Sequence, residues 1–161
     1  PNVEGVQWFL DNVWLDIAST LPEVHLYLAG KNMPASILSM ANNRLHVIGE
    51  IEDVVSFSLS KNIMIVPLLS GAGIRIKIVE AMAIGKVIIT TTVGAEGIGA
   101  EHMDTILIAK NADEFLQCIL FCFREKQKVI QIGKRAQAFI LDHYQRHAIY
   151  RDAIAFYQQM M

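Results

Sequence analysis

The chain has 161 residues, of which 53% are hydrophobic and 19% are charged, and its formal net charge is −2. This size and composition predict one well-packed globular domain and exclude a disordered or fibrous chain. The slightly negative charge argues against a nucleic-acid partner, because proteins that bind nucleic acids carry a basic surface. The longest apolar stretches are too short to cross a bilayer, and no segment reads as a secretory signal.

Helices and short strands alternate along the chain. The predicted helices cover residues 3–20, 34–42, 51–60, 74–84, 113–125, 128–143 and 148–161. The predicted strands cover residues 24–29, 45–48, 62–66, 87–91 and 105–108. Asn2 is expected to cap the first helix, and the last two helices form a C-terminal helical region over 128–161. Several strands are uninterrupted apolar runs, as in a parallel sheet covered on both faces. The predicted fold class is therefore α/β, a doubly wound and mainly parallel Rossmann-like sheet in a single domain over 1–161.

Three glycine-bearing loops follow three of the predicted strands. They are Gly49-Glu50, Ser70–Gly73 and Gly94–Gly99. Ligands of doubly wound sheets bind outside the carboxyl ends of the strands, where these loops are expected to lie together.

The most informative loop is Ser70-Gly71-Ala72-Gly73, which follows an apolar strand and opens a helix bearing Arg75, Lys77 and Glu80. Glycines let the backbone approach a ligand, and the free N–H groups and dipole of a helix start attract anions. Glu80 lies about 9–10 Å along the helix from its start, at a distance suited to a ribose diol. The pattern predicts a nucleoside diphosphate site. A plain turn with a surface Lys77–Glu80 pair stays open as the alternative, because the loop lacks a third glycine and the Gly-Lys-Ser/Thr of a Walker loop.

Other chemistry has weaker support. Cys118 and Cys122 are four residues apart on one helix, which predicts two buried free thiols in a reducing compartment. His143 and His147 have a spacing that could hold a metal, but no third ligand is apparent, so we expect a solvent-facing pair. No Asp-x-Asp occurs, and no metal or other cofactor is expected.

The chain resembles the C-terminal, donor-binding domain of the group 1 (family-four) retaining glycosyltransferases, which have GT-B architecture. The segments that carry the resemblance are 1–10, 47–54, 66–85, 91–97 and 132–136 with Tyr144. The resemblance implies a nucleotide- and donor-binding site made of Gly49, Glu50, Ile51, Gly71, Ala72, Gly73, Ile74, Arg75, Lys77, Glu80, Gly94 and Glu96. Glu80 corresponds to the second glutamate of the family's Glu-x7-Glu motif, which holds the ribose. The first glutamate, which contacts the donor sugar, is replaced by Ala72.

The resemblance also implies a function for a larger protein. The whole enzyme would transfer a sugar from a nucleotide diphosphate sugar to a glycan or lipid-linked acceptor, with retention, in polysaccharide biosynthesis. An N-terminal acceptor domain would be its partner in the same polypeptide. The enzyme would be cytoplasmic, and the N-terminal domain could associate with the inner face of the membrane. The 161-residue chain is then expected to be an inactive fragment, and no residue of it is assigned as catalytic. The central first strand of the sheet is also expected to be missing. A sugar-nucleotide epimerase of the same architecture and a non-catalytic nucleotide-binding module remain alternatives.

Overall fold

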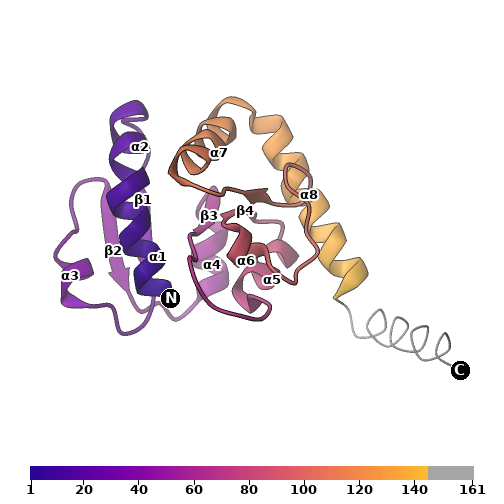
Figure 1. The fold of residues 1–161 in the computed structure, drawn as a ribbon, viewed down its shortest axis with the longest axis horizontal. Helices are drawn as coiled ribbons and strands as arrows, with labels where there is room; N and C mark the ends of the chain where they lie inside the picture. The colour runs from indigo at the N-terminus through magenta and orange to yellow at the C-terminus, as the bar shows by residue number, and fades with distance from the viewer. Residues whose placement is uncertain (145–161) are drawn as a thin grey trace, which may run out of the picture.

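The structure, a computed structural model, describes residues 1–144 and folds into helices packed around short parallel strands (Figure 1). The helices are α1 (Asn2–Phe9), α2 (Leu15–Thr20), α3 (Ala35–Leu38), α4 (Val54–Leu59), α5 (Ile76–Ala83), α6 (Thr92–Ala95), α7 (Ala112–Arg124) and α8 (Lys126–His143), with a π-helical segment, η1 (Leu10–Trp14), joining α1 to α2. The strands are β1 (Leu26–Ala29), β2 (Leu45–Gly49), β3 (Ile63–Val66), β4 (Val87–Thr90) and β5 (Leu107–Ile108). The predicted helix over 148–161 and the predicted histidine partner His147 lie outside the described residues.

The predicted α/β class with parallel strands is confirmed, and the sheet is interrupted. β1 pairs only with β2, whereas β3, β4 and β5 form a second sheet in that order, and every pairing is parallel. The interruption lies between β1 and β3, where a doubly wound sheet has its central strand. Within residues 1–144, no strand fills this position. The Lys61 ammonium, 3.9 Å from the ring centroid of Tyr27, makes one contact across the interruption.

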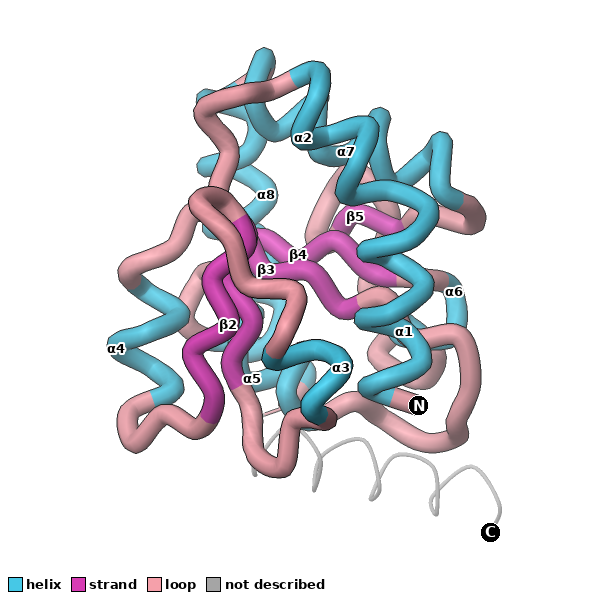
Figure 2. The backbone as a smooth tube through the Cα atoms, turned by 90° about the vertical axis from the view of Figure 1, so that its left-hand side faces the viewer, coloured by secondary structure: helices cyan, strands magenta, loops and turns pink. Residues whose placement is uncertain are grey.

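Two hydrophobic cores lie on opposite faces of β4. Val87 and Ile89 contribute to a core with α1, η1, α2 and α7, whereas Ile88 contributes to a core with α5 and the second half of α8. All four residues of β4 are buried, which explains why its first three, Val87 to Ile89, are all apolar. In the view of Figure 2, α1 lies on the right of the strands and α4 on the left. The β1–β2 pair shares the first of the two cores through half-buried Leu26 and Leu28.

Side-chain hydrogen bonds move two helix boundaries from their predicted positions and form one short helix that was not predicted. The helix predicted over 51–60 begins at Val54, because the Asp53 carboxylate accepts a hydrogen bond from the Ser56 N–H at 2.9 Å and caps it. The helix predicted over 34–42 ends at Leu38, and the Asn42 side chain instead accepts from the backbone of Arg44 and Leu45.

The unpredicted helix, α6, lies after β4 and includes part of the predicted Gly94–Gly99 loop. α6 forms there because the Thr91 hydroxyl caps it by accepting a hydrogen bond from the Gly94 N–H at 3.0 Å.

Candidate functional site

The loops after β3 and β4 meet at the carboxyl edge of the second sheet. The Thr90 hydroxyl donates to the Val66 carbonyl at 2.7 Å, and the Thr91 hydroxyl donates to the Leu68 carbonyl. A Cβ placed on Gly97 would lie 3.3 Å from Ile74 Cγ1, so the two loops are in contact at their outer ends. The structure therefore brings together two of the three loops that the sequence placed at this edge.

The loop after β3 needs both of its glycines. Gly71 and Gly73 have φ angles of 122° and 83°, a region of backbone conformation that side chains disfavour. The loop runs on to Arg75, and α5 begins only at Ile76, two residues later than the prediction from Ile74. Ala72, Gly73 and Ile74 are exposed, so their backbone is accessible to a ligand.

Arg75 lies beneath this loop with part of its hydrogen-bonding capacity unused. Its Nη1 donates to the Ala72 carbonyl at 2.7 Å, and a Cβ on Gly71 would come within 2.9 Å of Nη2. Its Nε and Nη2 are buried and find no hydrogen-bond partner among the described residues. Buried donors without a partner are rare and costly, and an oxyanion is the natural acceptor for a guanidinium.

Lys77 lies in the first turn of α5 and adds a second cation. The residue as a whole is exposed, but its ammonium donates to the Asn2 side-chain oxygen at 2.9 Å. Burial of the ammonium disfavours its charged form and lowers the pKa of Lys77, and the positive charge of Arg75 lowers this pKa further. Two cations close enough to repel each other indicate a place where an anion would relieve that repulsion.

The start of α1 forms the other wall of this site. Gly5 packs directly against the backbone before the glycine loop, because a Cβ on Gly5 would lie only 2.1 Å from the Pro67 carbonyl oxygen. One residue earlier, the Glu4 carboxylate accepts a hydrogen bond from the Ser70 hydroxyl at 2.9 Å. The start of α1 is therefore fixed beside the start of α5.

This wall was not predicted from the sequence. The prediction that Asn2 caps the helix is wrong: Pro1 occupies the cap position, no side-chain capping bond forms, and the Asn2 side chain contacts Lys77. The available signal was Gly5, because a glycine inside an amphipathic helix has a cost of about 1 kcal/mol that usually reflects close packing.

The remaining predicted site residues lie on both sides of the interruption in the sheet. Gly49 ends β2 with a φ of 80°, and the next residue, Glu50, forms an exposed ion pair with Lys31 at 2.7 Å. These two and the half-buried Ile51 belong to the β1–β2 side of the interruption.

On the other side of the interruption, Glu80 and Glu96 are exposed, Glu80 on α5 and Glu96 just after α6. Gly94 is buried, and a Cβ there would lie 2.0 Å from the Thr90 hydroxyl. Its small size therefore permits the close packing of α6 on β4.

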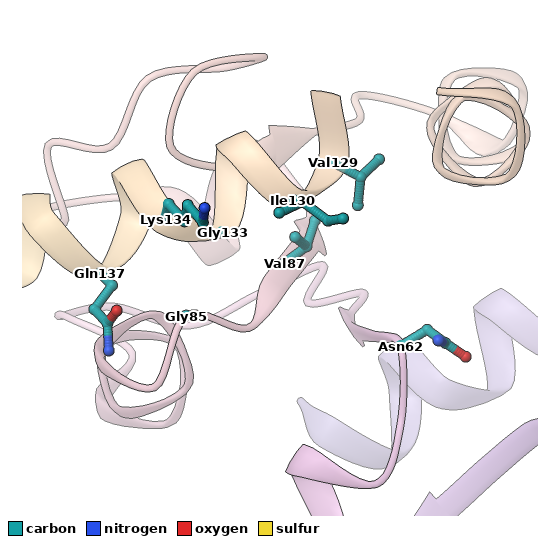
Figure 3. Close-up of a pocket in the computed structure, with 8 residues that line it drawn as sticks. All are labelled: Asn62, Gly85, Val87, Val129, Ile130, Gly133, Lys134 and Gln137. Atoms are coloured by element: carbon teal, nitrogen blue, oxygen red, sulfur yellow. The ribbon is translucent and has the colours of Figure 1, made fainter. Parts of the chain in front are cut away.

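A shallow pocket lies elsewhere, at the opposite ends of β3 and β4 (Figure 3). Its volume is about 250 Å³, and it is lined by Asn62, Gly85, Val87, Val129, Ile130, Gly133, Lys134 and Gln137. It forms where α8 crosses Gly85 so closely that a Cβ on Gly133 would meet the Gly85 carbonyl oxygen at 2.5 Å. Because it lies at the amino ends of the strands, it is separate from the carboxyl edge just described.

Across residues 1–144, no three side chains of histidine, cysteine, aspartate or glutamate come together in a way that could hold a metal ion. In the same part of the chain, every helix is too short or too polar to span a bilayer.

Comparison with known proteins identifies relatives of this chain. A curated protein from Klebsiella pneumoniae, described as an uncharacterized 44.6 kDa protein in the cps region, is 26% identical over 158 residues, covering 92% of this chain and 41% of that protein. The crystal structure of Anabaena Alr3699/HepE in complex with UDP-glucose matches with a TM-score of 0.75 and 20% identity, covering 96% of this chain and 46% of that one. The C-terminal domain of the group 1 family protein LpcC from Francisella tularensis matches with a TM-score of 0.71 and 13% identity, covering 91% of this chain and 82% of that domain.

The structural matches, at these identities, show the fold, and this chain spans less than half of the Klebsiella and Anabaena proteins. The family follows from the sequence. The model of the group 1 glycosyl transferases matches residues 1–125, which include β1 to β4, the glycine loop and both walls of the carboxyl-edge site. The chain belongs to the group 1 glycosyltransferases.

Proposed function

We propose that this chain is the donor-binding domain of a glycosyltransferase and that its carboxyl-edge site holds the diphosphate of a nucleotide sugar. The observation that carries the proposal is Arg75, whose Nε and Nη2 are buried without a hydrogen-bond partner among residues 1–144, beside a glycine loop and the start of α5. Lys77 adds a second positive charge. One protein of similar fold supports the choice of ligand, because Anabaena Alr3699/HepE was solved both with UDP-glucose and with UDP.

The donor-binding domain would contribute to the reaction by electrostatic stabilisation. Backbone N–H groups of residues 71–74, the dipole of α5 and the two cations would stabilise the negative charge that develops on the leaving diphosphate. Glu80, exposed on α5, would accept hydrogen bonds from the ribose hydroxyls and position the nucleotide. We propose Gly49, Glu50 and Ile51 as the part of the site that reads the base, and Glu96 as a group near the donor sugar.

Nucleotide binding by the full-length protein tests this proposal. Calorimetry should show that UDP, GDP or ADP binds better than the matching nucleoside. Glu80→Gln should weaken nucleotide binding by about 1–3 kcal/mol, the range for hydrogen bonds to a charged group. Glu23→Gln is the matched control, because Glu23 is exposed in the turn before β1, at the amino end of that strand. Unchanged affinity in Glu80→Gln would remove the ribose contact from this account.

A second pair of variants tests the cations. Arg75→Ala with Lys77→Ala should weaken diphosphate binding far more than nucleoside binding, and added salt should narrow the difference. Lys126→Ala with Lys128→Ala, at the exposed start of α8, is the control. Equal losses for the nucleotide and the nucleoside would mean that Arg75 and Lys77 are structural.

We propose further that the 161-residue chain alone transfers no sugar. Transfer requires an acceptor held against the anomeric carbon, and holding two reactants in place supplies several kcal/mol of the barrier. The acceptor would be held by an additional, N-terminal part of the polypeptide, closing over the donor. The free thiols of Cys118 and Cys122 support the cytoplasm as the location. Turnover by the isolated chain would refute this division of roles, and nucleotide binding without turnover in the full-length protein would favour a non-catalytic module.

A further inference from the structure

The carboxyl-edge site contains an acid where a site for phosphate alone would have none. Glu4, exposed on the first turn of α1, lies 2.9 Å from the Ser70 hydroxyl at the beginning of the glycine loop. The cations of the site belong to the same loop and to the first turn of α5. A carboxylate this near a diphosphate costs electrostatic energy unless it has a favourable contact of its own.

The position of this carboxylate is fixed by backbone packing. Gly5 allows α1 to approach the Pro67 carbonyl so closely that no side chain would fit between them. The Asn2–Lys77 hydrogen bond, 2.9 Å long, joins the same turn of α1 to α5. Glu4 lies between these two contacts in the sequence, so the helix holds its side chain at the glycine loop.

The present partner of Glu4 indicates which chemical group it accepts. A carboxylate is an acceptor only, and here it accepts the hydrogen of an aliphatic hydroxyl. The hydroxyls of a sugar are donors of the same kind. The loop itself offers no acidic side chain, since residues 70–75 are Ser, Gly, Ala, Gly, Ile and Arg.

We propose that Glu4 binds the sugar of the donor, accepting hydrogen bonds from its hydroxyls while α5, Arg75 and Lys77 hold the diphosphate. This inference rests on the proposed function and assigns the sugar-binding carboxylate to α1. The Ser70 hydroxyl donates a hydrogen bond to the Glu4 carboxylate, and a sugar hydroxyl would take its place as the donor. The ligand class is thereby narrowed to diphosphates that carry a polyhydroxylated group.

The test compares UDP with a panel of UDP-sugars, including UDP-glucose, by calorimetry on the full-length protein. Glu4→Gln keeps the size of the side chain and removes its charge. We expect UDP to bind within about twofold of wild type, and the advantage of the preferred UDP-sugar over UDP to fall roughly tenfold, as expected for losing a charge-assisted hydrogen bond. Asp16→Asn, an exposed acid on α2, is the matched control and should change neither affinity.

Ser70→Ala separates sugar binding from a structural role, because it leaves Glu4 intact and removes only the present hydrogen bond. The sugar advantage should survive in Ser70→Ala. If Ser70→Ala loses that advantage as Glu4→Gln does, Glu4 acts through the loop and the inference is wrong. It is also wrong if Glu4→Gln weakens UDP and UDP-sugar equally, or if wild type shows no preference for any UDP-sugar; in both cases UDP binding leaves the proposed function standing. Wild type that binds no nucleotide refutes the proposed function itself.

Discussion

Gly5 is the residue whose substitution tests the architecture of the carboxyl edge most directly. In Gly5→Ala the new methyl group would lie 2.1 Å from the Pro67 carbonyl oxygen and 2.9 Å from its carbonyl carbon. Both atoms belong to the backbone, so no side-chain rotation relieves the contact. The first turn of α1 and the loop after β3 must separate by roughly 1 Å, the kind of shift that accompanies overpacking.

The expected magnitude combines two opposing effects. Overpacking at a site closed by backbone costs about 1–3 kcal/mol. Replacing glycine by alanine within a helix returns about 1 kcal/mol, because alanine loses less backbone entropy on folding. The overlap at Gly5 is severe, so we place the overpacking at the upper end and expect a net loss of about 2 kcal/mol. For a chain of this size, such a loss lowers Tm by roughly 4–8 °C.

Thermal unfolding followed by circular dichroism measures this change, and nucleotide calorimetry measures its effect on the site. Gly30→Ala is the control, because a Cβ there meets only the end of the Met33 side chain at 3.7 Å. Gly5→Ala should also lower the advantage of UDP-sugar over UDP, since the shift moves Glu4 away from Ser70. A Gly5→Ala protein that melts at or above the wild-type temperature would refute the close packing of α1 on this loop.

Two further predictions concern groups away from the site, namely the buried Cys118 and Lys86 and the half-buried Cys122. Burial, with the neighbouring Glu114 second, raises the pKa of Cys118 to about 11, and burial, with Cys118 second, raises that of Cys122 to about 12. At pH 8 both thiols should therefore react slowly with a disulfide reagent in the native protein and rapidly in denaturant, and fast native labelling would contradict their burial. Burial lowers the pKa of Lys86 from its ordinary value of 10.5, so the unfolded state binds more protons than the native state just below that pH, and stability should rise with pH there. Lys86→Met should flatten this rise in urea unfolding between about pH 8 and 10, and an unaltered slope would show that another group causes it.

Much of the fold was predictable because its signals are local. The apolar run that opens the strand predicted over 87–91 indicated a strand covered on both faces, and all four residues of β4 are buried. Helix boundaries were less predictable where a side chain competes with the backbone, as at Asp53 and Asn42. The interruption of the sheet was expected from the family resemblance and not from any residue pattern.

In the candidate site, too, the local features were predicted from the sequence and the long-range contact was not. The glycine loop with Arg75 and Lys77 was visible because it is contiguous in sequence. Glu4 was not predicted as a site residue, because its contact with Ser70 joins residues 66 positions apart. Such a contact depends on where the helix docks, which periodicity cannot specify.

The interruption between β1 and β3 has a consequence for how the molecule opens. No backbone hydrogen bond joins the two sheets within residues 1–144, and no residue of β1 is fully buried, whereas all of β4 is. Although the β1–β2 pair shares one core with β4, only Leu45 among its residues is buried. We therefore expect its amides to exchange with solvent faster than those of β4. Gly49 and Glu50 belong to the β1–β2 sheet, and the glycine loop belongs to the other sheet. A nucleotide that contacted both loops would bridge two sheets that no backbone hydrogen bond joins within residues 1–144, and fixing them relative to each other would reduce its net affinity.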